Sequence, residues 1–250
     1  MSRRRLSLKL TAVALCALAV AAGEAAGETS PFELRSPLLS FEVLPAKLPA
    51  AKAAPARLAI TGKYHRVDGL HVSALKELLI MGDRHLALDL DEMPSCRLPG
   101  FGPRVDRSGE CPESVVARGS ITVATFFPGD RDIPTTSRLT LWKTGRERGG
   151  VKLFAYAYLT APVVAELLIP VEIRRLPKGR FGWKAVASVP KIAGGGGSIT
   201  DFTLTIRRKL LSATCRRYFQ FKSVSVLADG SRLDEAFVRR CAVTETNVRQ

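Results

Sequence analysis

The stretch FQFKSVSVLADGSRLDEAFV, residues 219–238, places Asp229-Gly230 between two runs in which apolar and polar residues alternate. A period of two is typical of a strand with one buried face, and Asp-Gly between two such runs indicates a two-residue hairpin turn. Regular pairing across this turn sets Tyr218 opposite Cys241. The stretch therefore predicts an antiparallel hairpin close to the C-terminus.

The apolar positions of the first run of this hairpin do not keep one parity. They change from Phe219 and Phe221 to Val224 and Val226. A single extra residue in one strand shifts the parity of the positions that follow it. We therefore predict a β-bulge near Lys222-Ser223.

The same period of two recurs through most of the chain after Ala56, and Gly, Pro or Asp separates the runs. Val151–Leu159 is apolar on both faces, which favours a central strand. A short helical turn is expected only near Cys111–Ala117, where Pro112 suits the first helical position. Regularly spaced short strands are typical of an antiparallel sandwich. We expect an all-β fold, a single antiparallel β-sandwich with at most short helical turns. The alternating runs are Leu58/Ile60, Leu86/Leu88/Leu90, Ile121/Val123, Leu139/Leu141, Phe181/Trp183/Ala185/Ala187 and Phe202/Leu204/Ile206.

The N-terminus has the composition of a cleaved export signal. Basic residues within 3–9 precede an apolar run at 10–22 and a small-residue stretch at 23–27. This order is that of a secretory signal, and the apolar run is shorter than the roughly 20 residues that span a bilayer. The later apolar segment Ala161–Ile173 is also short and contains two prolines. We expect an exported protein, extracellular or loosely attached to the cell envelope, with no transmembrane segment in the mature chain.

The expected organisation has four parts. Residues 1–27 form the signal peptide, and residues 28–57 an irregular arm with one short strand at Leu39–Leu44. Residues 58–243 form the β-sandwich domain, and residues 244–250 a C-terminal tail.

Four cysteines, Cys96, Cys111, Cys215 and Cys241, follow the signal. An even count in an exported chain indicates disulfides, for which three connectivities are possible. Proximity in sequence favours Cys96–Cys111 and Cys215–Cys241, and the hairpin brings Cys215 within about 10 Å of Cys241 along the strands. A zinc site needs close pairs such as C-x-x-C, which the chain does not contain.

The chain is strongly basic, with a formal net charge of +15. Removing Arg3, Arg4, Arg5 and Lys9 subtracts four and removing Glu24 adds one, which leaves +12 for a chain that starts at Glu28. A surface of this charge attracts polyanions through salt-screened forces. Outside the membrane these are envelope polymers or anionic lipid heads, and we expect no nucleic acid as partner.

The histidines do not predict a metal site. His85 shares an expected strand face with Asp89 and Asp91, but His85 and Asp89 are about 13 Å apart on an extended strand, too far for one ion. Asp89 and Asp91 are about 7 Å apart and could contribute to a calcium site with loop oxygens. A solvated strand face is the preferred interpretation, and we expect no metal and no cofactor.

Catalytic motifs are fragmentary. Ser73-Ala74-Leu75-Lys76 and Lys143-Thr144-Gly145 match two elements of the penicillin-binding protein signature, but the third element is missing and a strand pattern follows at once where a long helix is needed. Gly194–Gly197 precedes a strand, which favours an inter-strand loop over a phosphate cradle. No credible Ser/His/Asp arrangement is visible, so we assign no catalytic residue.

Eight segments of the chain carry a resemblance to a known group of proteins. They are Ile60–Tyr64, Asp68-Gly69, Ser73–Glu77, Met93–Cys96, Glu110–Pro112, Ala155–Leu159, Val189–Gly195 and Cys215–Cys241. Together they resemble a group of exported β-rich proteins of actinobacteria, especially Solirubrobacter-like soil lineages, that has no assigned activity. The resemblance covers roughly Leu58 to Cys241 and implies the same cysteine framework, but no catalytic residues. At Met81–Arg84 the relatives tend to carry a more acidic turn, which puts any shared cation site there in doubt.

These observations favour a secreted or envelope-associated, non-catalytic β-sandwich that binds an anionic envelope polymer or a protein partner. The alternative is an extracellular hydrolase whose carboxylates carry no recognisable spacing along the chain. A third possibility is a component of a larger assembly, which an uncovered edge strand would reveal.

Overall fold

The computed structural model describes residues 34–35, 38–97, 105–127, 132–147, 149–162 and 164–244, and most of these residues lie in β-strands. The expected signal peptide lies outside these residues, as does the C-terminal tail beyond Thr244. The all-β antiparallel class is confirmed, since helical structure in the described residues is limited to three single 3-10 turns. None of the described helices is long and apolar enough to cross a membrane.

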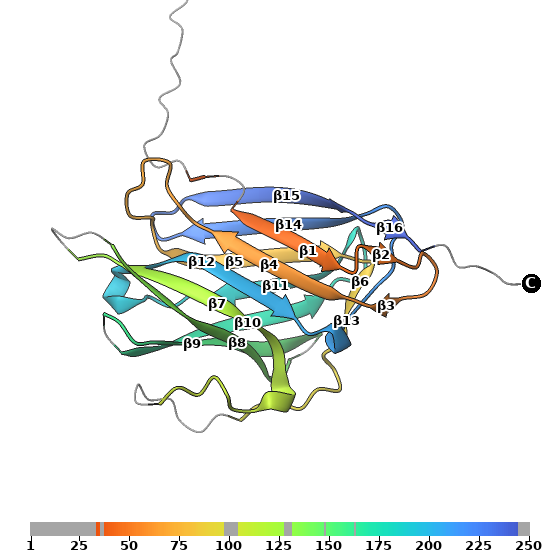
Figure 1. Ribbon diagram of the computed structural model, residues 1–250, viewed down its shortest axis with the longest axis horizontal. Helices are drawn as coiled ribbons and strands as arrows, with labels where there is room; N and C mark the ends of the chain where they lie inside the picture. The colour runs from red at the N-terminus through yellow and green to blue at the C-terminus, as the bar shows by residue number, and fades with distance from the viewer. Residues whose placement is uncertain are drawn as a thin grey trace, which may run out of the picture. The chain divides into compact units, whose positions relative to one another are not determined.

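Eleven strands form one antiparallel sheet in the order β1-β4-β12-β7-β8-β9-β10-β11-β5-β14-β15 (Figure 1). The central strand of this order is β9, which contains the run that is apolar on both faces. The strands of this sheet are β1 (Leu39–Leu44), β4 (Arg57–Lys63), β5 (Leu75–Asp83), β7 (Val115–Thr125), β8 (Ile133–Glu147), β9 (Gly150–Leu159), β10 (Ala165–Arg175), β11 (Phe181–Ser188), β12 (Gly197–Ile206), β14 (Tyr218–Leu227) and β15 (Arg232–Arg240).

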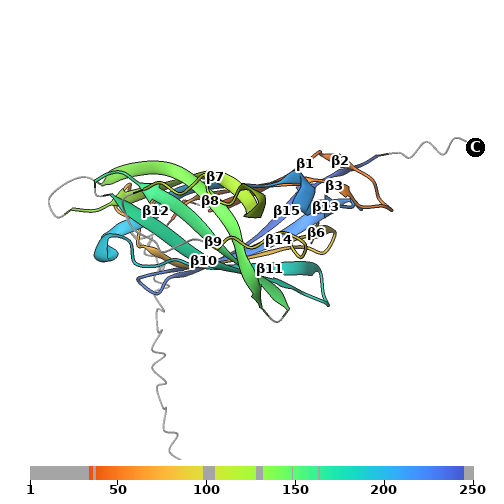
Figure 2. The same ribbon diagram turned by 90° about the horizontal axis from the view of Figure 1, so that it is seen from below.

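The large sheet curls until it is nearly a barrel, so that the two packed layers of the expected sandwich come from one sheet. Seen from below, β10 and β11 lie opposite β1 and β7 (Figure 2). The inward residues of both walls form one large apolar core. Such curling lets a long antiparallel sheet bury one face of every strand.

The edge strands β1 and β15 meet through side chains. Both carboxylate oxygens of Glu235 accept the backbone N–H of Leu38, at 2.9 and 3.2 Å. The Arg239 Nε donates to the carbonyl of Phe41 at 2.7 Å. The ring of Phe41 stacks on Phe221 with centroids 4.4 Å apart and meets the Phe237 ring edge-on at 5.0 Å. These contacts, which we call the seam, supply backbone partners that an edge strand otherwise lacks.

A smaller sheet packs beside one end of the barrel. It has the order β3-β13-β6, formed by Ala54–Pro55, Leu211–Ala213 and Leu86–Leu88, and a two-stranded sheet pairs β2 (Lys47–Leu48) with β16 (Ala242–Val243). The segment expected to be an irregular arm with one strand therefore contributes β1, β2 and β3, one to each sheet. The 3-10 turns are η1 (Pro112–Ser114), η2 (Ala193–Gly195) and η3 (Arg208–Leu210).

Lys143 anchors the segment that follows β6. The side chain is almost fully buried, and its Nζ donates to the carbonyls of Leu90, Asp91 and Met93 at 2.7, 3.0 and 2.5 Å. Burial lowers the pKa of this ammonium, and the nearby Arg146 acts in the same direction. The three carbonyls accept all three of its protons, so the buried cation is saturated with hydrogen bonds.

The C-terminal hairpin forms, but two details of the prediction are wrong. Leu227 N–H donates to the Ser231 carbonyl, so the loop has three residues and ends on Gly230 with a φ of 92°. This third loop residue shifts the pairing by one, and Tyr218 lies opposite Arg240 instead of Cys241. A three-residue loop with glycine in this conformation is a common alternative to the two-residue turn.

The predicted bulge at Lys222-Ser223 is also wrong, because pairing between β14 and β15 is continuous from Tyr218 to Val226. Ser223 and Ser225 are buried and keep the inward parity of the phenylalanines before them. Ser225 shares a 2.9 Å hydrogen bond with the buried Tyr64 hydroxyl, whose pKa burial raises to about 12. A polar partner inside the barrel replaces the apolar residue that the pattern led us to expect.

Candidate functional site

The clearest candidate site is a basic groove at the end of β12. It has a volume of about 560 Å³ and is lined by five basic residues and no acidic residue. We define the basic groove by Arg57, Pro112, Arg118, Thr205, Ile206, Arg207, Arg208 and Lys209.

The strand register explains why these cations gather on one surface. Thr205 pairs with Ala59 of β4 on one side and with Arg118 of β7 on the other, and all three face outward because Ile206 faces the core. Arg57 and Arg207 lie one position beyond the Ile206–Leu58 pair. The exposed arginines of three neighbouring strands therefore converge where β12 ends.

Most of the groove cations lack an acidic partner. Among the described residues, no carboxylate lies within salt-bridge distance of Arg57, Arg118, Arg208 or Lys209. The Arg207 Nη1 donates to the carbonyls of Pro112 and Val115, at 3.2 and 3.1 Å, which fixes its guanidinium. Like charges on neighbouring strands are destabilising unless a counter-charge is present. The groove can supply several donors to phosphate or carboxylate oxygens.

A second hollow of about 340 Å³ adjoins the basic groove and shares Arg208 and Lys209 with it. It extends over η3 to Leu211 and Ser212, and Asp89 is the one carboxylate in its lining. The cationic surface therefore continues from the wall of the barrel onto the smaller sheet. An extended anion could follow it over both.

The four cysteines form the two disulfides that proximity favours. Cys96 and Cys111 are joined with Cα atoms 5.6 Å apart, and Cys215 and Cys241 with Cα atoms 5.9 Å apart. The second bond ties the open end of the hairpin despite the shifted register, because Cys241 N–H donates to the Arg217 carbonyl nearby. Neither pair is a metal site, since both sulfurs are consumed in the bond.

The segment around Cys111 covers a polar cluster on the outer face of β8 and β9. Arg107 N–H donates to the Tyr156 hydroxyl at 3.0 Å, and that hydroxyl lies 3.3 Å from Glu166 Oε1. Burial raises the pKa of Tyr156 to about 12; the Arg107 N–H lowers it and the charge of Glu166 adds to the rise. Trp142 packs against Tyr156 with centroids 5.2 Å apart, and no residue of this cluster lines a hollow described above. We interpret the cluster as the anchor of this segment.

His85 occupies a site different from the one expected. His85 lies in the turn after β5, where its Nδ1 is 2.8 Å from Asp83 Oδ1, so the expected strand face shared with Asp89 and Asp91 is wrong. Asp91 instead forms an ion pair with Arg175 at 2.8 Å. The described residues contain no group of three or more side chains able to hold a metal ion.

The structure corrects one further exclusion, because it brings a serine, a histidine and an aspartate together. His71 Nε2 is 3.1 Å from Ser198 Oγ, and His71 Nδ1 is 2.8 Å from Asp132 Oδ2. The order of contacts is that of a catalytic triad. The members come from three separate segments, so no local motif could reveal them.

Two features of this chain of contacts differ from a working triad. The Ser198 side chain is buried, with 1% of the residue exposed, and its hydroxyl donates to the Val72 carbonyl at 2.6 Å. A hydroxyl has one proton, so a Ser198 that donates to Val72 does not donate to His71, as a triad serine does to its histidine.

The fragments of the penicillin-binding signature also serve separate local roles. Ser73 Oγ accepts the N–H of Asp229, next to the C-terminal hairpin, whereas Lys143 is buried against the carbonyls after β6. The residues after Ser73 form β5, where that signature needs a helix. The two matches are therefore coincidental.

Comparisons of the chain with protein-family models, with curated proteins and with solved structures gave no significant match.

Proposed function

We propose that this protein is an exported, non-catalytic β-barrel-like protein that binds an anionic polymer of the cell envelope through the basic groove. The observation that carries the proposal is the convergence of five cations without a carboxylate in one groove. A chain whose basic charge served only solubility would need no such gathering, which costs repulsion among neighbouring strands. The two disulfides are compatible with an oxidising location outside the cytoplasm.

The test is co-sedimentation of the mature, disulfide-bonded protein with isolated cell envelope in low and high salt. The groove variant carries Arg57→Gln, Arg118→Gln, Arg208→Gln and Lys209→Gln, and it spares Arg207, which donates to backbone. The matched control removes four exposed lysines elsewhere, at positions 52, 76, 178 and 191, so both variants have a net charge of +12 − 4 = +8.

We expect the wild type and the lysine control to sediment in low salt, and the groove variant to stay in solution. High salt should release the wild type, because an electrostatic contact on a surface is screened. Equal retention of the two variants would assign binding to overall charge and refute a groove. No sedimentation of the wild type in low salt would refute the proposal as a whole.

The Ser198–His71–Asp132 contacts are the specific observation that favours the alternative, an extracellular hydrolase. The burial of Ser198 and its donation to Val72 oppose it, because a nucleophile must reach its substrate. A fluorophosphonate probe distinguishes the two functions, since it forms a covalent adduct with activated serines. We expect no adduct on Ser198. An adduct that His71→Ala abolishes would establish the hydrolase instead.

A further inference from the structure

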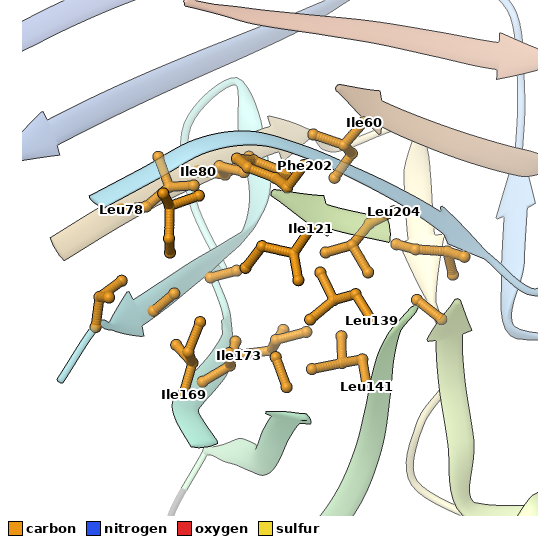
Figure 3. A pocket seen from close by; sticks show the side chains of 18 of the residues that line it. Ile60, Leu78, Ile80, Ile121, Leu139, Leu141, Ile169, Ile173, Phe202 and Leu204 are labelled. Carbon is orange, nitrogen blue, oxygen red and sulfur yellow. The ribbon is translucent and has the colours of Figure 1, made fainter. Parts of the chain in front are cut away.

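An apolar chamber lies inside the barrel, on the opposite face of the sheet from the basic groove. Its accessible volume is about 110 Å³, and every strand from β4 to β12 contributes to its lining. All of the lining residues are apolar, and Figure 3 shows the side chains of Ile121, Leu139 and Ile173 among those that meet around it. Natural cores are packed almost without such voids, so the chamber needs an explanation.

Small residues keep the chamber open. Ala117, Ala155, Ala185 and Ala187 line it, at positions where neighbouring strands present Leu or Ile. A larger residue at any of them would occupy part of the space. Cores built only for stability favour side chains that fill such gaps.

The two aromatic side chains of the lining also leave the space free. The ring of Phe202 lies over Gly62 of the next strand, so close that a Cβ at Gly62 would come within 2.1 Å of it. The ring of Trp183 lies over Gly82 in the same way, and its Nε1 donates to the Leu86 carbonyl at 3.1 Å. Both rings are thereby held against the wall and not across the chamber.

The lining defines the chemistry of an occupant. Its one hydrogen-bonding side-chain group, the Trp183 Nε1, already donates to Leu86, and an apolar cavity of this kind excludes water and accepts apolar molecules. The lining residues on β12 run from Ile199 to Ile206, which spans about 24 Å at roughly 3.4 Å per residue. The modest volume over this length favours a slender molecule over a bulky one.

We propose that the chamber is a binding site for a slender apolar molecule of the alkyl-chain class, inserted along β12. This proposal is independent of the basic groove, because a neutral chain needs no cation. Its occupant is selected by cross-section and by the absence of polar groups along its length.

The experiment uses the disulfide-bonded full chain and the methyl ester of cis-parinaric acid, a neutral, unbranched polyene dye whose fluorescence rises in apolar surroundings. Unbranched 1-alkanols of six to twelve carbons then compete with the dye. Ala185→Leu fills part of the chamber, and Ala155→Val is a smaller change that serves if the first variant does not fold. Ala236→Leu is the matched control, because Ala236 is exposed on β15.

We expect the wild type and Ala236→Leu to bind the dye equally, and the chamber variant to bind it at least tenfold more weakly. Competition should strengthen as the alkanol lengthens, because each added methylene is buried. Equal dye binding by the folded chamber variant and the control would place the dye elsewhere and overturn the proposal. A wild type that binds no dye would overturn it too, whereas the groove experiment above would be unaffected.

Discussion

The closure of the sheet at the seam depends on Phe41, and replacing it with alanine tests that dependence. Phe41 is 2% exposed and belongs to the short edge strand β1. Its ring contacts Phe221 and Phe237 of the two strands at the opposite edge. Phe41→Ala removes these contacts but leaves the backbone pairing of β1 with β4 intact.

The expected loss follows from burial and ring contacts. Truncating a buried Phe to Ala costs about 3–5 kcal/mol, including the cavity left behind. Aromatic pairs at these distances add roughly 0.5–1.5 kcal/mol beyond buried area. We expect a loss of about 4 kcal/mol in the free energy of unfolding. A domain stability of about 5–15 kcal/mol leaves this variant folded.

The assay is urea unfolding without reductant, combined with amide hydrogen exchange. Phe181→Ala is the control, because Phe181 of β11 is only partly buried, and we expect it to cost about 1 kcal/mol. Exchange should accelerate most in β1 and β15 and least in β8 and β9. Equal losses in the two variants, or exchange in β1 unchanged by Phe41→Ala, would refute closure through this ring.

Three further predictions concern other parts of the fold. Replacing Cys215 and Cys241 by alanine should lower the free energy of unfolding by about 3.5 kcal/mol, and replacing Cys96 and Cys111 should lower it by about 3 kcal/mol, because the two bonds join residues 26 and 15 positions apart. Urea unfolding measures both losses, and the reverse order would contradict an origin in the chain entropy of the unfolded state. Lys143→Met should lower the free energy of unfolding by about 3 kcal/mol, because three carbonyls lose a charged donor. Removing the buried charge also removes its desolvation cost, but this gain offsets only part of the loss. An unchanged midpoint of urea unfolding would mean that water replaces the ammonium. The pKa values of Tyr64 and Tyr156 are raised to about 12 from an ordinary 10, so the stability from their neutral forms is complete below pH 10 and is lost as pH rises through 12. Absorbance at 295 nm should show a step near pH 12 that shrinks in Tyr64→Phe and Tyr156→Phe, and a full step in the double variant would contradict the assignment.

The strands were predictable because each buries one face, so that apolar and polar residues alternate along its sequence. Closure of the sheet was not, because it depends on contacts such as Leu38 with Glu235, which are 197 residues apart. The false bulge has the same origin. Ser223 and Ser225 face inward beside Tyr64, and a polar residue with a distant partner inside the barrel has the local pattern of an outward one.

The candidate sites show a similar division. Net charge predicted an anionic partner, but the register of β4, β12 and β7 decides that Arg57, Arg118 and Arg207 converge. The contact between His71 and Ser198 joins residues 127 positions apart, so no spacing rule could include it. The exclusion of a Ser/His/Asp arrangement was therefore wrong in geometry, although the burial of Ser198 still argues against catalysis.

The basic groove and the apolar chamber meet at one strand, and the alternation of that strand makes the two proposals separable. Ile206 of β12 contributes to both linings, while its neighbours Thr205 and Arg207 face only the groove. At the end of β12 the side chains of Leu204 and Ile206 therefore face the chamber, whereas those of Thr205 and of Arg207, which follows the strand, face the groove. Substitutions at Arg118 or Arg57 leave the interior unchanged, and a substitution at Ala185 leaves the cationic surface unchanged. Because no residue is altered in both variant sets, a loss of envelope binding and a loss of dye binding report on two different faces of the same sheet.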